Sequence, residues 1–403
     1  MGIMGLGIAT SLSQWVSMIV GALFFLSPKA SLKYSVRGIP WKELGRMVTI
    51  GLPSAMVFFL TAFRNSLFNN LLAAYDPTMI AIAAISTYAI SMVVFESVGK
   101  GIAGAGRLLT SVYYGEEDDR SLIYLIKTIF TKGILITLTA SALTFLLANF
   151  VTGLYYPDPA SEIYRMTVRG LRFGAAILIL ETIANVFSSY FSSIGRHVIV
   201  NIMAVLEGIA AMAPFGLLLI PRVGFDGVLF SYLIGYGIVA LCGPVYAIFY
   251  WKRLPRTLRE WMTLPADFGA PDEERLDASI HSLEDAMAVS EEVRAFCRER
   301  KIDKKEAYYS ALALEELCLG IIKDRFGADK KRHTIEVRAL RKGDSIFMSL
   351  KDDCKPFNAR ERADLVNPQD DSPKSISIRV FMGIAKDTEY QFTLGINVFT
   401  VTL

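Results

Sequence analysis

The chain has 403 residues, of which 53% are hydrophobic and 20% charged, with a formal net charge of +3. The charges are unevenly distributed, because the first 254 residues contain 30 charged side chains and the remaining 149 contain 51. This division predicts a membrane domain followed by a water-soluble domain, and it excludes a single soluble enzyme, a disordered chain and a secreted disulfide scaffold.

Seven hydrophobic segments in the first part are long enough to cross a bilayer, since about 20 helical residues span about 30 Å. They are expected at Ile3–Leu26, Val48–Ala74, Met79–Val112, Leu122–Leu154, Met166–Phe191, Val198–Ile220 and Val228–Trp251. Basic residues follow the first segment (Lys29 to Arg46) and the last (Lys252 to Arg259), so both of these ends are expected in the cytoplasm. The sequence therefore predicts a multi-pass protein of the inner (plasma) membrane with a cytoplasmic C-terminal domain.

Charged residues inside the predicted spans are candidates for a transport pathway, because a charge at membrane depth is costly unless it is paired or hydrated. Glu181 and Glu207 have apolar neighbours on both sides, in LILETIAN and AVLEGIAA. Asn185 follows Glu181 by one helical turn, and Arg64 and Glu96 complete the set of candidate residues. The alternative is that the two carboxylates are structural and pair with Arg64 or Arg172 inside the bundle.

Several stretches of the membrane part resemble the MATE family of multidrug and toxic compound extrusion transporters. They are Met4–Thr10, Gly51–Ala55, Gly101–Arg107 with Tyr114–Asp118, Tyr190–Arg196 and Val223–Val228. The resemblance covers the sixth to the twelfth span of that family. It implies two six-helix lobes in a whole family member, alternating access, and export of organic cations or lipid-like solutes coupled to H+ or Na+. Two interpretations remain open: the chain is a fragment that lacks five spans, or it is a half-transporter that must form a dimer.

The second part predicts a cytosolic α+β sandwich after a proline-containing amphipathic linker at residues 254–271. Strands are expected at Arg275–Ser282, His333–Leu340, Ser345–Lys351, Glu389–Leu394 and Asn397–Leu403, and helices at Leu283–Arg300, Lys304–Lys323 and Ser375–Lys386. The membrane domain then comprises residues 1–253 and the α+β domain residues 272–403.

The order of these elements resembles the GHKL class of ATPase domains, and most closely the anti-sigma-factor serine kinases. The first motif of that class corresponds to Glu315–Asp324, which places Glu316 at the general-base position and Gly320 at the position of the Mg2+-binding asparagine. The second corresponds to Asp352–Asn358, which places Asp352 at the adenine-binding aspartate and Cys354 at a glycine. The ending Gly395–Thr400 retains the asparagine and threonine of the class, at Asn397 and Thr400.

The differences from the GHKL class fall at positions that bind the metal ion and the phosphates in that class. Gly320 has no side chain to bind a metal, and no Gly-Leu-Gly turn lies near Ser377–Val380 to close on phosphates. The sequence therefore predicts weak or absent ATP hydrolysis, and binding of ATP without effective Mg2+ stays open through Asp352, Asn397 and Thr400. The alternative is that the acidic residues are solvated groups on a degenerate scaffold.

Composition argues against other cofactors and partners. The four cysteines are far apart without a C-x-x-C pair, and the three histidines lack metal-ligand spacing, so no metal site is expected. The charge balance gives no indication of nucleic-acid binding. The leading hypothesis is a transporter with a fused regulatory domain that binds a bilayer, a small substrate and a protein partner of the tail. The alternative hypotheses are a membrane-anchored signalling protein and an N-terminally truncated fragment.

Overall fold

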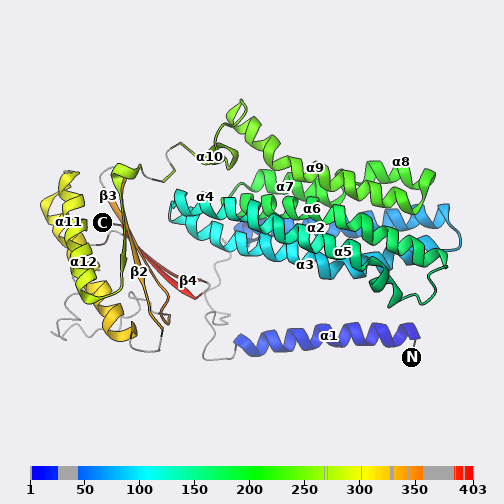
Figure 1. Ribbon diagram of the computed structural model, residues 1–403, viewed down its shortest axis with the longest axis horizontal. Helices are drawn as coiled ribbons and strands as arrows, with labels where there is room; N and C mark the ends of the chain where they lie inside the picture. Colours follow the sequence, from blue (N-terminus) through cyan, green and yellow to red (C-terminus); the bar gives the residue numbers. More distant parts are fainter. Residues whose placement is uncertain are drawn as a thin grey trace.

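The structure is a computed structural model, and it describes residues 2–25, 44–266, 268–269, 271–300, 302–326, 331–342, 345–356, 385, 387–393 and 395–402. Long helices occupy the first part of the chain and an antiparallel sheet with two helices occupies the second (Figure 1). The helix predicted at Ser375–Lys386 and the end of the second ATPase-like motif, Phe357 and Asn358, lie outside the described residues.

Each of the seven predicted hydrophobic segments corresponds to a helix or to a continuous helical run. They are α1 (Gly2–Phe25), α2 (Leu44–Tyr75), α3 (Ile80–Gly115), α4 to α5 (Asp119–Thr128 and Ile134–Gly153, joined by a π-helical turn at Ile129–Gly133), α6 (Glu162–Ser193), α7 to α8 (His197–Val205 and Ala213–Val223, joined by a π-helical turn at Leu206–Ala210) and α9 (Phe225–Trp251). Within the described residues, five of these runs are long and apolar enough to cross a membrane: α3, α4–α5, α6, α7–α8 and α9.

The other two helices, α1 and α2, contain side chains outside the described residues, so the prediction of seven spans stays open for these two. Gly7–Leu23 is the apolar stretch of α1 whose side chains are described. α2 has 32 residues, enough to cross a bilayer as a helix. α1 lies beside the bundle in Figure 1, and its apolar side chains are exposed, for example 61% at Trp15 and 77% at Met4.

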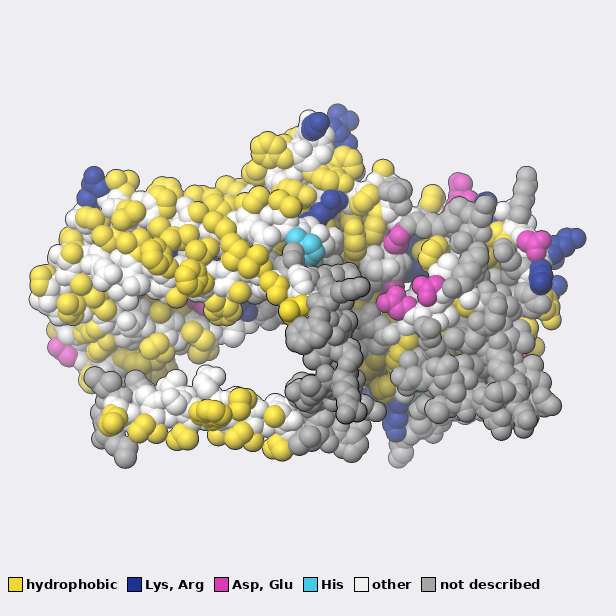
Figure 2. Space-filling view, turned by 180° about the vertical axis from the view of Figure 1, so that it is seen from behind, with side chains coloured by type: hydrophobic (Ala, Val, Ile, Leu, Met, Phe, Trp, Pro, Cys, Tyr) yellow, Lys and Arg dark blue, Asp and Glu magenta, His cyan; other side chains and the backbone are white. Residues whose placement is uncertain are grey.

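α6 is the central helix of the bundle, and it packs against α3, α5 and α9. Glycines allow the closest approach, because a Cβ on Gly174 would lie 2.8 Å from the Met92 sulfur of α3. The largest buried side chains of this core include Phe68, Leu171 and Met212. Hydrophobic side chains cover much of the outer surface of the bundle (Figure 2), as expected for helices surrounded by lipid.

The described residues of the C-terminal part form five antiparallel strands in the order β1-β2-β3-β5-β4. The strands are β1 (Arg275–Ile280), β2 (Ile335–Lys342), β3 (Ser345–Asp352), β4 (Asp387–Thr393) and β5 (Ile396–Thr402), and the helices are α11 (Leu283–Glu299) and α12 (Lys304–Ile321). α11 starts with a capping box between Ser282 and Asp285, which supplies partners for backbone donors of the first turn.

The two helices cover one face of the sheet, and the other face lies toward the bundle (Figure 1). Alternation along the strands explains this arrangement, because successive side chains point to opposite faces. Ile335, Val337 and Ala339 of β2 are buried in the core with α11 and α12. The short helix α10 (Leu258–Trp261) lies between the bundle and the sheet in sequence, within the predicted linker.

Candidate functional site

The bundle contains a cluster of charged side chains centred on Glu181 of α6, which is 5% exposed. Lys100 of α3 lies 3.7 Å from the Glu181 carboxylate and 2.8 Å from that of Glu96, one turn earlier on α3. Asn185 hydrogen-bonds to Glu181 from the next turn of α6. The structure therefore brings together three of the five residues predicted for a transport pathway, and it adds Lys100.

The other two predicted residues, Arg64 and Glu207, meet at the π-helical turn of α7–α8. The amide of Ala211 bonds to the carbonyl of Leu206, five residues earlier, so the carbonyl of Glu207 loses its usual helical donor. The Arg64 guanidinium donates a hydrogen bond of 2.8 Å to this carbonyl and lies 5.1 Å above the ring of Tyr232. Arg64 is thus held by a backbone oxygen and an aromatic ring.

The cluster around Glu181 and the contact of Arg64 with Glu207 influence each other electrostatically, because the charges of both Glu96 and Glu207 act on Glu181. Three carboxyl groups, of Glu96, Glu181 and Glu207, thus share two cations, Lys100 and Arg64. Such a group inside a membrane bundle is suited to exchange a proton or a small cation as the helices move. The alternative pairing of the carboxylates with Arg172 is not among the ion pairs of the described residues.

In the C-terminal part, the structure brings together two of the three residues predicted to bind a nucleotide. The Asn397 side chain donates to the Asp352 carboxylate at 2.8 Å, and the Cys354 amide donates to the same oxygen at 2.9 Å. Burial raises the pKa of Asp352, against the opposing effect of these hydrogen bonds. The third residue, Thr400, lies three positions after Asn397 in β5 and therefore on the opposite face of the sheet.

Glu316 and Gly320 lie on α12, where both are partly buried. A Cβ added at Gly320 would meet no atom within 4 Å. Space therefore exists at this position for a larger side chain. The general-base role of Glu316 stays a prediction.

The structure also brings together three candidate metal ligands that no sequence pattern indicated. Ligand atoms of His333, Asp353 and Cys354 lie within 4.8 Å of one another, and His333 Nδ1 is 3.0 Å from the Asp353 carboxylate. The spacing in sequence gives no signal, because His333 precedes β2 whereas the other two follow β3. The antiparallel register, which pairs Ile335 with Asp352, brings them together.

A second feature without a clear sequence signal is an ionic contact between the two parts of the chain, which we call the loop–sheet contact. The acidic turn Glu116–Asp119, between α3 and α4, lies against the face of the sheet opposite α11 and α12. Its ion pairs join Lys351 with Glu116 at 2.5 Å, Arg275 with Asp119 at 3.3 Å and Asp118 at 3.6 Å, and Arg338 with Asp118. The acidity of this turn was visible in the sequence, but its basic partners were not.

Comparison with known proteins supports the fold of the membrane part. An outward-facing multidrug resistance MATE family transporter of the MOP superfamily aligns with a TM-score of 0.50 and 20% identity, over 61% of this chain and 55% of that chain. A MOP superfamily transporter from Pyrococcus furiosus, described by a reversed polarity of its binding pocket, aligns with a TM-score of 0.50 and 19% identity, over 60% and 56%.

The chain thus spans little more than half of the solved structures that it matches, and the likeness establishes a MATE-like fold for its membrane part. No protein-family profile and no curated protein sequence matches the chain.

Proposed function

We propose that the bundle is one lobe of a cation-coupled transporter of organic solutes of the MATE type, and that Glu181 is its principal coupling carboxylate. The observation that carries this proposal is the buried Glu181 between Lys100 and Glu96 on the neighbouring helix. A buried carboxylate with one nearby cation can change partners when a proton or Na+ binds, and this change would favour a different helix arrangement.

The test uses the full chain in proteoliposomes with an imposed pH or Na+ gradient and a fluorescent organic cation. We expect Glu181→Gln to reduce gradient-driven uptake at least tenfold, because the amide cannot exchange a proton or hold a cation. Glu162→Gln is the matched control, since it makes the same change at an exposed site in the first turn of the same helix. Equal uptake by Glu181→Gln and the unaltered chain would contradict the assignment.

The same experiment should measure the oligomeric state, because the chain covers only about half of a solved transporter and a dimer would supply two lobes. Cross-linking in the liposomes would show whether transport accompanies a dimer. A chain that catalyses no gradient-driven flux of cationic dyes in any assembly would contradict the transport proposal itself.

We further propose that the C-terminal part is a regulatory domain on the cytoplasmic side, connected to the bundle by the loop–sheet contact. This contact joins the turn between two long helices to the sheet, so a ligand or partner that moves the sheet would pull on α3, which contains Lys100 and Glu96. Weakening the contact with Arg338→Gln is expected to alter the transport rate without abolishing the gradient dependence. An unchanged rate in an otherwise active variant would exclude this coupling.

The second candidate function, a membrane-anchored nucleotide-binding or signalling protein, is favoured by the Asp352–Asn397 pair. ATP titrated into the full chain, with and without Mg2+, should raise its thermal midpoint if the adenine displaces Asn397 from Asp352. No shift at millimolar ATP would remove nucleotide binding and leave a protein-interaction role. Gly320→Asn restores the family's metal-binding side chain, and a new Mg2+ dependence in this variant would support the alignment.

A further inference from the structure

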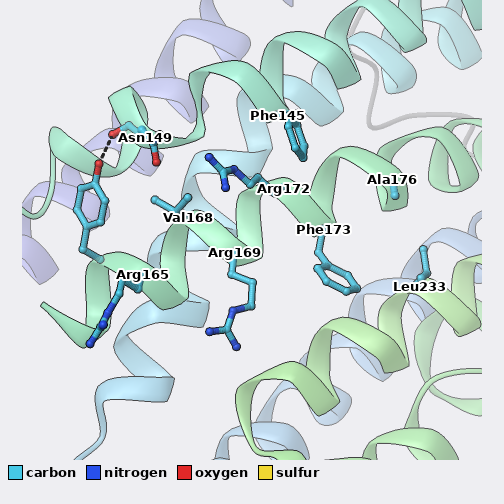
Figure 3. Close-up of a pocket in the computed structure, with 10 residues that line it drawn as sticks. Phe145, Asn149, Arg165, Val168, Arg169, Arg172, Phe173, Ala176 and Leu233 are labelled. Atoms are coloured by element: carbon cyan, nitrogen blue, oxygen red, sulfur yellow. Dashed lines mark hydrogen bonds between the residues drawn. The ribbon is translucent and has the colours of Figure 1, made fainter. Parts of the chain in front are cut away.

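A groove on the side of the bundle is lined by arginines and apolar side chains that are not part of the cluster around Glu181. It has a volume of about 610 Å3 and lies between α5, α6 and α9, toward the end of the bundle remote from the sheet. One end of the groove is basic and the other is apolar. Arginines lie at the end near the start of α6, and apolar side chains line the deeper end, among them Phe173, Ala176 and Leu233 (Figure 3).

Three arginines of α6 line the groove: Arg165, Arg169 and Arg172, spaced by four and three residues. They cover about 11 Å along the helix axis at a rise of about 1.5 Å per residue. In Figure 3, Arg172 points toward Phe145 of α5, whereas Arg165 and Arg169 leave α6 on its other side. The three side chains therefore flank the groove rather than converge on one internal partner.

The positive charge of this groove exceeds the negative charge that contacts it. Arg169 pairs with Asp226 at the start of α9, with a distance of 2.7 Å. Arg172 lies 5.3 Å above the ring of Phe145, and Arg165 has no ion pair with a described residue. Arg165 and Arg172, about two turns apart on α6, are thus left without an ion pair among the described residues. A bound anion would supply a negative charge for them.

The depth of the groove indicates where the two ends lie in a bilayer. α6 has 32 residues and a length of about 48 Å, which exceeds the hydrocarbon thickness of about 30 Å by roughly 9 Å at each end. Arg165 and Arg169 then lie near the headgroup level, and Ala176 lies in the hydrocarbon. Arg172 is between them, at a depth where an exposed charge is costly unless it has a counter-charge or water.

We propose that this groove binds an anionic phospholipid of the surrounding bilayer. The phosphate would lie against Arg165 or Arg172, the two arginines without an ion pair, with Arg169 retained by Asp226, and one acyl chain would follow Phe173, Ala176 and Leu233. Guanidinium groups suit phosphate because they form paired, charge-assisted hydrogen bonds. The arrangement of charge above an apolar slot matches an amphiphile better than a soluble anion.

The test measures lipid retention and therefore does not depend on the transport proposal. The full chain is placed in nanodiscs of phosphatidylcholine with a minor fraction of phosphatidylglycerol, extracted, and analysed by native mass spectrometry for bound lipid. We expect selective retention of phosphatidylglycerol, and a loss of about tenfold in the double variant Arg165→Gln, Arg172→Gln, since each lost charge pair is worth about a factor of ten or less. Arg222→Gln, an exposed arginine at the same end of the bundle on α8, is the matched control.

Two further arms separate the sources of binding. Ala176→Trp fills the apolar end without changing charge, and it should lower retention of phosphatidylglycerol if the acyl chain occupies that end. Glycerol phosphate, the soluble headgroup, should compete only weakly; competition equal to that of the lipid would replace the proposal with a site for soluble anions. If the double variant does not fold, the thermal midpoint of the unaltered chain is measured with short-chain phosphatidylglycerol and with short-chain phosphatidylcholine. A larger increase with phosphatidylglycerol would support the proposal, and an equal one would contradict it. Equal retention of both lipids, or an undiminished preference in the double variant, would mean that the arginines are only hydrated at the membrane surface.

Discussion

Removal of the charge at Asp118 provides the sharpest test of the loop–sheet contact. Asp118 is 0% exposed, and its carboxylate contacts Arg338 and Arg275 of the sheet. The same side chain caps α4 by accepting a hydrogen bond of 3.1 Å from the Ser121 amide. Asp118→Asn keeps an oxygen for the cap but removes the charge, whereas Asp118→Ala removes both.

The expected magnitudes follow from this division of roles. Breaking a buried ion pair by removing one partner costs about 3–5 kcal/mol, and the 15% exposure of the Arg338 side chain argues for the lower end of that range. Loss of the cap adds about 1 kcal/mol. We therefore expect Asp118→Asn to lower the free energy of unfolding by about 3 kcal/mol, and Asp118→Ala by about 4 kcal/mol.

The assay is a double-mutant cycle of Asp118→Asn and Arg338→Gln. Guanidinium unfolding of the full chain in detergent micelles is followed by tryptophan fluorescence. The coupling energy should be about 2 kcal/mol, because the second change costs little once its partner has lost its charge. A coupling energy below about 0.5 kcal/mol would refute the reasoning, since it would mean that the loop and the sheet do not interact in solution.

The pH dependence of the same cycle has a defined sign. Burial alone would raise the pKa of Asp118, but the hydrogen bond from Ser121 and the charge of Arg338 outweigh it and leave the pKa below its usual value. A carboxyl with a lowered pKa contributes stability above its unfolded pKa, and this contribution is lost as the pH falls through the folded pKa. The coupling energy should therefore be constant near neutral pH and shrink in acid.

Three other predictions concern packing and reactivity. Gly227→Ala should destabilise the bundle by more than about 2 kcal/mol, because the added Cβ would lie 2.7 Å from backbone atoms of α8. Gly101→Ala should be neutral or stabilising by up to about 1 kcal/mol, because its Cβ would meet no atom within 4 Å. The thermal unfolding midpoints of the two variants are compared with that of the unaltered chain. Cys318 should react with maleimide only after unfolding, since burial raises its pKa to about 12, and mass spectrometry of labelled peptides checks this. Arg64→Met should destabilise the bundle by about 1–3 kcal/mol, because the carbonyl of Glu207 would lose its donor; a fully stable variant in thermal unfolding would contradict this.

The local structure of this protein was largely readable from its sequence. Helices such as α9 and α12 agree with the predicted ranges to within about three residues, because hydropathy and apolar periodicity are properties of neighbouring residues. The same is true of the hairpin of β2 and β3. The two π-helical turns, at Ile129–Gly133 and Leu206–Ala210, escaped prediction, since each depends on a single inserted residue rather than on hydropathy.

The candidate sites depended instead on contacts between distant residues. Glu181 and Glu207 could be singled out because a carboxylate in an apolar run is conspicuous, but the role of Lys100 required the packing of α3 on α6. Strand register decided that Asp352 meets Asn397, whereas the opposite face of Thr400 follows from its odd spacing from Asn397 along β5.

By itself, the sequence determined that a membrane bundle precedes an α+β domain, because burial from water or lipid acts on each segment through its own composition. Only the tertiary structure decided which charges face each other, including the contact of Asp118 with Arg338 and the division of the α6 groove into a basic and an apolar end. The physical reason is that ion pairs and cavities form between side chains that are more than a hundred residues apart or on different helices. Their positions follow from packing angles and strand register, which no local pattern encodes.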